Sequence, residues 1–244
     1  MKEKKKAKSV DTEIANGEII AEINEPVVKE KKEKKAKKEK KEKKVKKVKN
    51  RSKYTSKYFA KFSGRSNQSY DQMLKEDYDR MIKRALELSS ITEDSYSSYM
   101  MITVPDAFDQ SSKVNYRLDK KADGTYTLLY DQALITALFF GDDVLYYHQA
   151  NVDHRNGHIA YDVSGEFNYF DVVHMETSLK YDNPNHPKYL MLDLEIGLVD
   201  GTIVPFHLRN HRIHEEYIFD GVLTAEEKKL LDTLKSKVRE SRKV

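Results

Sequence analysis

Three histidines near the end of the chain are the residues whose type and spacing most suggest chemistry. His207, His211 and His214 lie in the stretch HLRNHRIHEE. On a helix, residues four apart share one face, so His207 and His211 could hold a metal ion. The preceding stretch TIVPFHL instead predicts a strand, on which these two side chains would lie about 13 Å apart, with His214 on the opposite side. We therefore expect exposed or capping histidines, with a metal-dependent hydrolase as the alternative.

The other candidates for catalysis have simple structural explanations. His154 and His158 flank the dipeptide Asn156-Gly157, which predicts solvent-exposed turn residues. Asp193 and Glu195 lie two apart, as expected for the polar face of a half-exposed strand. There is no GxSxG, Walker or GxGxxG motif, and no cysteine for a thiol nucleophile, a disulfide or a thiolate metal site. The sequence predicts a non-enzymatic protein without a cofactor.

Contact with polyanions is a second kind of chemistry that the sequence suggests. Residues 1–53 hold 21 Lys and Arg against 10 Asp and Glu, a net charge of +11. Subtraction from the totals of 44 and 40 leaves 23 and 30 for residues 54–244, a net charge of −7. The glutamates of the arm end at Glu42, so positive charge is concentrated between Lys43 and Arg65. Residues 1–53 are too polar to form a core and predict a disordered basic arm.

The junction NRSKYTSKYFAKFSGRS, residues 50–66, alternates basic and aromatic side chains. Three interpretations are open. The rings could stack on unpaired bases while lysines follow phosphates, or enter a membrane interface while lysines meet anionic headgroups. The rings could also simply dock this segment onto the acidic body. The residues predicted to bind an anionic surface are Lys43, Lys44, Lys46, Lys47, Lys49, Arg51, Lys53, Lys57, Tyr58, Phe59, Lys61 and Phe62.

Helices and strands must position these residues. Apolar residues recur every three to four positions over 70–88, which predicts an amphipathic helix, with Ser69 and Gln72 as its capping box. From residue 99 the apolar period is two, as in half-buried strands. Glycine-containing dipeptides that favour tight turns separate these strands, at Asp123-Gly124, Gly141-Asp142, Asn156-Gly157 and Asp200-Gly201.

The chain closes with a second predicted helix. Thr224 and Glu227 fit a capping box, followed by an apolar stripe over 230–238. The predicted fold class is α+β: one helix, an antiparallel meander of seven to eight strands, and one C-terminal helix.

This order resembles the pleckstrin-homology-like (PH-like) architecture. The stretch ITALFFGDDVLYYHQANVDHRNGHIAYDVSGEFNYFDVVHMETSLKYD is similar to bacterial PH-like domains, and the resemblance covers roughly residues 124–241. Members of this family include phosphoinositide binders, peptide binders and oligomerisation modules. Lipid-binding members place Lys or Arg after their first strand. If ITALFF is that strand, the following GDD is acidic, which argues against a headgroup pocket.

The sequence thus predicts an intracellular adaptor. No apolar run approaches the roughly 18–20 residues of a membrane span, because the longest, ALITALFF, has 8. We expect a cytoplasmic protein, peripheral to the membrane, whose β domain binds a protein partner while the arm contacts an anionic membrane surface. An RNA- or ribosome-associated protein that uses the same arm is the alternative. The predicted parts are the arm at 1–53, a linker at 54–68, the helix at 69–98 and the PH-like domain at 99–244.

Overall fold

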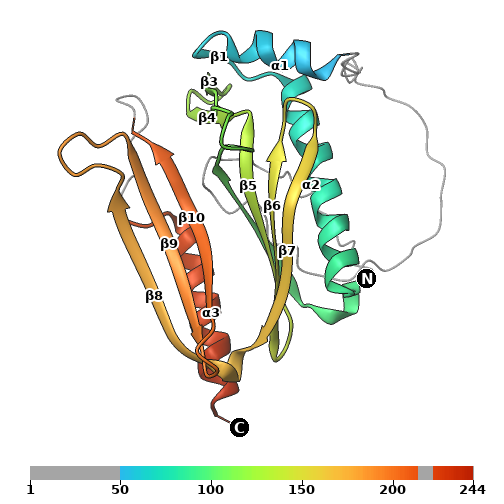
Figure 1. The fold of residues 1–244 in the computed structure, drawn as a ribbon, viewed down its shortest axis with the longest axis vertical. Coiled ribbons are helices and arrows are strands. Elements are labelled where there is room, and N and C mark those ends of the chain that lie inside the picture. Colours follow the sequence, from blue (N-terminus) through green and yellow to red (C-terminus); the bar gives the residue numbers. More distant parts are fainter. Residues whose placement is uncertain (1–49, 214–221, 244) are drawn as a thin grey trace, which may run out of the picture.

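The computed structural model describes residues 50–213 and 222–243. The lysine block before residue 50 and His214 lie outside these ranges. The described part is α+β and contains three α-helices and ten strands (Figure 1). Their bounds are α1 Arg51–Phe59, β1 Ser63–Arg65, α2 Gln68–Ser89, β2 Ser98–Pro105, β3 Tyr116–Lys120, β4 Tyr126–Tyr130, β5 Gln132–Phe140, β6 Val144–Asp153, β7 His158–Asn168, β8 Val172–Tyr181, β9 Tyr189–Leu198, β10 Ile203–Arg212 and α3 Ala225–Ser241.

The strands form three sheets. The first sheet has the order β2-β5-β6-β7 and the second sheet the order β10-β9-β8, both antiparallel. Between β2 and β5 the chain leaves the first sheet to form the hairpin β3–β4, which β1 joins in parallel as the small sheet. In Figure 1 the first and second sheets diverge from their lower ends, α2 runs along the first sheet, and α3 lies behind the second.

Two apolar cores lie on opposite faces of the first sheet. On β5, Leu138 and Phe140 enter the core that the first sheet shares with the second sheet and α3. Ile135 and Phe139 enter the core that the sheet shares with α1 and α2. Burial on both faces explains why this strand reads as the almost continuous apolar run ALITALFF.

The predicted helices and turns are largely confirmed. The C-terminal helix begins with the predicted capping box of Thr224 and Glu227. The predicted capping box at Ser69 is wrong, because α2 begins earlier and Asn67 accepts the hydrogen bond from the Ser69 amide. Gly124, Gly157 and Gly201 have φ of 93°, 75° and 87°, the left-handed conformation that the predicted turns require.

The prediction of one seven- to eight-stranded meander is wrong. The stretch YTLLYDQALITALFF is rich in apolar residues throughout and contains no turn signal, so the change of direction at Asp131 was not predicted. The buried carboxylate of Asp131 accepts hydrogen bonds from the Asn115 backbone and side-chain amides, at 2.8 and 2.7 Å. This contact separates β4, in the small sheet, from β5, in the first sheet. The predicted linker at 54–68 contains β1 and most of α1, which begins at Arg51, within the predicted arm.

Candidate functional site

The aromatic side chains of the junction point into the protein. Tyr58 is buried, its ring stacks on Tyr70 with centroids 4.7 Å apart, and its hydroxyl donates to Asp119. The Arg117 guanidinium lies 4.3 Å from the centre of the Tyr58 ring and donates to the Tyr58 carbonyl at 2.7 Å. Burial, together with the hydrogen bond to Asp119, raises the pKa of the Tyr58 phenol. The half-buried Phe59 packs edge-on against Tyr70. These rings dock α1 onto the body.

Arg51 also points inward, into a buried charge cluster. The carboxylate of the fully buried Asp77 on α2 accepts hydrogen bonds from Arg51, Arg80 and His154. Arg51 donates in addition to the His154 carbonyl, at 2.7 Å. Burial would raise the pKa of Asp77, but the hydrogen bonds and positive charge of His154 and Arg51 outweigh it and leave this pKa below its ordinary value.

This cluster overturns one prediction about the turn histidines. His154 is fully buried, and its ring Nδ1 lies 2.7 Å from the Asp77 carboxylate of α2. His158, on the other side of the same turn, is exposed as expected. The residue that buries His154 lies 77 positions earlier in the chain. A local turn pattern cannot predict a contact between residues so far apart in the sequence.

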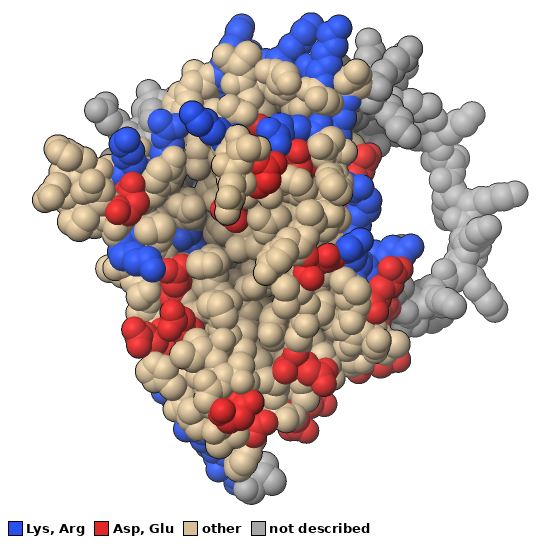
Figure 2. Space-filling model, in the orientation of Figure 1, with Lys and Arg blue, Asp and Glu red and all other residues tan. Residues whose placement is uncertain are grey.

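The lysines of the junction point outward. Lys53 and Lys57 lie four apart on α1, opposite the buried Thr55 and Tyr58. We call five exposed residues that form no ion pair within the described chain the basic face: Lys53, Lys57, Lys61, Arg65 and Lys120. Arg65 and Lys120 are register partners on β1 and β3. Figure 2 shows blue side chains gathered at the α1 end of the molecule, while red ones predominate over much of the lower half of this view.

The twelve residues predicted to bind an anionic surface thus have different environments. Five of them, Lys43 to Lys49, lie outside the described residues. Arg51 and Tyr58 are engaged inside the protein, and Phe59 is half-buried. Phe62 is 40% exposed, with the Arg212 guanidinium 5.9 Å from its ring centre. Among the seven predicted residues that the structure describes, the exposed cations are Lys53, Lys57 and Lys61.

The histidines near the end of the chain do not come together. His207 is exposed on β10 with its Nδ1 2.8 Å from Asp193, whereas His211 is buried, contrary to prediction. A β-bulge between His207 and Arg209 shifts the register by one residue and turns the following side chains to the other face. Within residues 50–213 and 222–243, no three His, Cys, Asp or Glu side chains are grouped as a metal ion would require.

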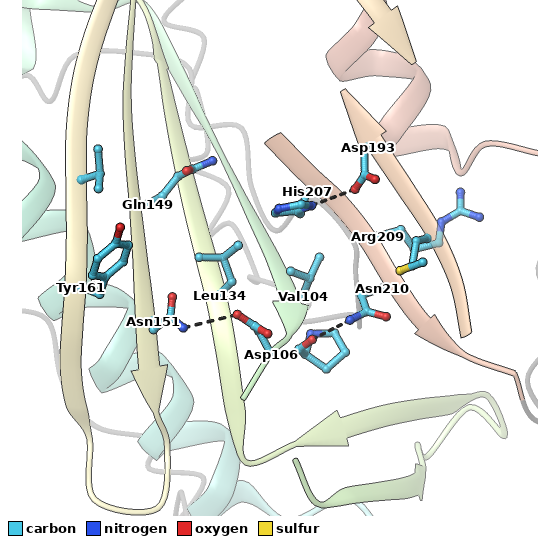
Figure 3. Close-up of a pocket in the computed structure, with 13 residues that line it drawn as sticks. Val104, Asp106, Leu134, Gln149, Asn151, Tyr161, Asp193, His207, Arg209 and Asn210 are labelled. Atoms are coloured by element: carbon cyan, nitrogen blue, oxygen red, sulfur yellow. Dashed lines mark hydrogen bonds and ion pairs between the residues drawn. The ribbon is translucent and has the colours of Figure 1, made fainter. Parts of the chain in front are cut away.

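A cleft of about 340 Å³ lies in the corner between the first and second sheets (Figure 3). Leu192 and Leu194 of the second sheet face the core with α3, so the alternating Met191 and Asp193 face the cleft. Two hydrogen bonds join the two sheets at this cleft: Gln149 donates to the Pro205 carbonyl and Asn210 to the Pro105 carbonyl, both at 3.0 Å. We call this space the corner cleft. Its apolar wall is formed mainly by Val104, Leu134, Val163 and Met191.

Two carboxylates line the corner cleft, and they differ in whether a positively charged side chain lies next to them. Asp193 lies 2.7 Å from the Lys180 ammonium and 2.8 Å from the His207 ring. Burial would raise the pKa of Asp193, but these two partners outweigh it and leave the pKa below its ordinary value. The half-buried Asp106 accepts only amide hydrogen bonds, from Ala107 at 3.0 Å and Asn151 at 3.3 Å, and forms no ion pair within the described residues. The cleft therefore suits a ligand group with positive charge.

Tyr161 marks the outer wall of the corner cleft on β7 (Figure 3). It has φ of 52° and is 84% exposed, beside the irregularity that interrupts the β6–β7 pairing between Gln149 and Asn151. Positive φ is unfavourable for a residue with a side chain, and such strain is concentrated at functional sites. Neither Tyr161 nor Asp106 was a sequence candidate. No motif marks them, since they come together from β7 and the end of β2.

A comparison of the chain with protein-family models, with curated proteins and with solved structures finds no match. In the part of the chain that the structure describes, no helix has the length and apolar character needed to cross a membrane.

Proposed function

We propose that this chain is a non-enzymatic binding protein whose basic face contacts an anionic membrane surface and whose body binds a protein partner. One observation carries the proposal. The junction turns its rings inward and its lysines outward, so the α1 end presents charge with little aromatic surface. Residues 50–66 contain five basic residues and no acidic one.

This separation favours a membrane surface over single-stranded nucleic acid. Proteins that bind unpaired strands stack bases on exposed rings, and here Tyr58 is buried and Phe59 half-buried. A headgroup layer needs only positive charge, and each lysine near it contributes about 1 kcal/mol. The three exposed lysines of the junction would thus add about 3 kcal/mol to the free energy of membrane binding, beyond the contribution of the arm. Phe62, which is 40% exposed next to Lys61, is the most exposed of the four rings of the junction and could enter an interface.

We further infer that the body is a PH-like domain. Its support is an antiparallel sheet of four strands, followed along the chain by one of three strands and a helix. On this interpretation the first strand is β2 rather than ITALFF, which is β5. The segment after the first strand, residues 106–131, then holds four basic residues and five aspartates, whereas GDD has no basic residue. The argument against a headgroup pocket, which rested on GDD, therefore no longer applies.

Vesicle sedimentation tests the membrane contact. The full chain should pellet with vesicles containing phosphatidylserine and stay in solution with phosphatidylcholine alone, with binding that falls as salt rises. The variant Lys53→Glu/Lys57→Glu/Lys61→Glu should lose at least about tenfold in affinity. The matched control Lys228→Glu/Lys235→Glu/Lys243→Glu changes three exposed lysines of the α3 region and should bind better than the junction variant.

Two results would count against the membrane proposal. Equal losses in the two triple variants would mean that total charge, rather than the basic face, controls binding. Nuclease-sensitive sedimentation with ribosomes, without vesicle binding, would favour the RNA alternative.

We propose the corner cleft as the site for the protein partner. Its supports are the apolar wall, the unpaired Asp106 carboxylate and the strained Tyr161, which together fit an apolar segment carrying Lys or Arg. Selection from a random peptide library should enrich such sequences. Asp106→Asn should weaken the selected peptides, whereas Asp142→Asn, at an exposed turn, should not. Peptides without a basic residue, or equal binding by the two variants, would contradict this assignment.

A further inference from the structure

The second sheet ends in a long strand with a free edge. β8 spans ten residues, Val172–Tyr181, and within the described chain pairs only with β9. It lies at the outer side of the molecule in Figure 1. Leu179 and Tyr181 are 42% and 52% exposed on it. Such an edge offers a row of backbone hydrogen-bonding groups to another strand.

The pairing with β9 shows which backbone groups of β8 point outward. The Asp182 amide donates to the Tyr189 carbonyl at 3.2 Å, in register with the pairs Lys180–Met191 and Ser178–Asp193. In an antiparallel ladder, alternate residues direct both backbone groups to the same neighbour. The even-numbered residues from 174 to 182 therefore bond to β9. The outward groups belong to Met175, Thr177, Leu179 and Tyr181.

The even-numbered side chains of β8 include a carboxylate that faces another carboxylate. Glu176 lies directly opposite Glu195 of β9, and both are exposed. Like charges at directly opposite positions destabilise a sheet. The nearest cation on the strand, Lys180, is 2.7 Å from Asp193, and His174 is 3.3 Å from Glu176. The edge thus presents a carboxylate that an external cation would stabilise.

We propose that a second copy of this chain occupies the edge, with the two β8 strands antiparallel about a two-fold axis at Ser178. Glu176 then lies opposite the partner's Lys180, and Lys180 opposite the partner's Glu176. The same pairing occurs twice because the interface is isologous. At the axis two serines meet at a position that is not hydrogen-bonded across the strands, where side chains approach most closely.

The register follows from charge and backbone geometry together. If the numbers of two paired residues added up to an odd number, each outward-pointing residue of one β8 strand would face a residue of the other strand whose backbone groups point to β9. A shift of the axis by one residue in either direction places Glu176 opposite the partner's Ser178 or the partner's Asp182, so the charge match is lost. In the proposed register Met175 meets the partner's Tyr181 and Thr177 meets the partner's Leu179, which covers the exposed apolar side chains on the α3 side of the sheet.

Sedimentation velocity on the full chain tests the dimer through two single substitutions. The wild-type chain should show a reversible monomer–dimer equilibrium. Glu176→Lys alone and Lys180→Glu alone should each shift it to monomer, because each sets two like-charged pairs across the axis. An equimolar mixture of the two variants should again form dimers, since each heterodimer restores both opposite-charge pairs.

The mixture separates the proposal from a folding defect, because misfolded variants would not recover association on mixing. The double variant Glu176→Lys/Lys180→Glu should also dimerise. The proposal is overturned if the wild-type chain stays monomeric at the highest soluble concentration. It is equally overturned if the single variants dimerise as the wild type does, or if their mixture stays monomeric.

Discussion

The two sides of the first sheet bury charge in different ways. On the α2 side, Asp77 is shared by Arg51, Arg80 and His154, which come from three separate parts of the chain. On the α3 side, Arg209 of β10 forms a two-contact ion pair with Glu227, and both side chains are fully buried. The first cluster includes an arginine with a half-exposed side chain. The second is closed off from water.

The two buried clusters hold different helices in place. Arg51 is the first residue of α1, so the Asp77 cluster fixes the helix that carries Lys53 and Lys57. The Arg209–Glu227 pair instead joins the second sheet to the start of α3, where Glu227 also accepts from the Thr224 amide. We expect the α3 side to determine global stability and the α2 side to respond to pH and to control the basic face.

The largest expected effect is on the α3 side. Glu227→Gln leaves Arg209 buried without a counter-charge and should lower the free energy of unfolding by about 3–5 kcal/mol. Glu226→Gln, at the exposed neighbouring position, should cost less than about 1 kcal/mol. Urea unfolding followed by circular dichroism measures both. Similar costs for the two variants would show that the buried pair does not anchor α3.

Asp77→Asn should have a smaller effect, about 1.5–3 kcal/mol, because Arg51 and Arg80 retain some access to water. Its specific consequence is local. With α1 less firmly held, trypsin should cleave after Lys53 and Lys57 faster than in the wild-type chain. The control Asp79→Asn lies at an exposed position of the same helix. Unchanged cleavage in Asp77→Asn would show that the Asp77 cluster does not hold α1, the helix that carries Lys53 and Lys57.

The pH dependence should also differ between the two sides. Burial lowers the pKa of His148, whose Nδ1 lies 2.7 Å from the Ser164 hydroxyl. The folded state therefore holds this imidazole neutral, and the unfolded chain takes up its proton first as pH falls below the ordinary value of 6.5. This contribution to stability is present above pH 6.5 and is lost below it.

The free energy of unfolding should thus fall between pH 7 and pH 5 in the wild-type chain, and less steeply in His148→Gln. His186→Gln, at an exposed loop position, is the control. Hydrogen exchange should show α2 losing protection at a higher pH than α3. Identical pH profiles for the wild type and His148→Gln would contradict the assignment. The contribution of Asp77 acts only at more acidic pH, because its lowered pKa keeps it ionised until then.

The smallest expected effect concerns Arg84 on α2, which pairs with Asp162 of β7 at the surface. Because the Arg84 side chain is about half exposed, Arg84→Ala should cost less than about 1 kcal/mol. Lys83→Ala, at an exposed position next to it, is the control. Thermal unfolding of the two variants should differ only slightly. A large loss in Arg84→Ala would mean that the α2 side depends on its surface pair as much as on the Asp77 cluster.

Local patterns predicted the elements well where local physics decides them. The glycine turns follow from the left-handed backbone at Gly124, Gly157 and Gly201. The apolar period of α2 and the capping box at Thr224 depend on residues within one or two helical turns. The division into three sheets was not predictable in this way. It depends on a corner at Asp131, whose partner Asn115 lies across the hairpin β3–β4.

The candidate site, too, was predicted only where it depends on local sequence. The concentration of positive charge between residues 43 and 65 is a property of the sequence itself, and so is the absence of a thiol. Which of those residues face solvent is not. Tyr58 and Arg51 are drawn inward by Asp119 and Asp77, and His211 is turned inward by a bulge.

Local sequence patterns were therefore enough to predict α2, α3, the glycine turns, the alternating strands and the division of charge, because each depends on neighbours along the chain, whereas α1 was predicted as linker. The tertiary structure was needed to show that the junction separates its lysines from its rings, and that Asp106 and Tyr161 line a common cleft. The physical reason is that burial of a charge or a ring requires partners far away in sequence. Asp77 and His154 are 77 residues apart, and Tyr58 and Asp119 are 61 apart.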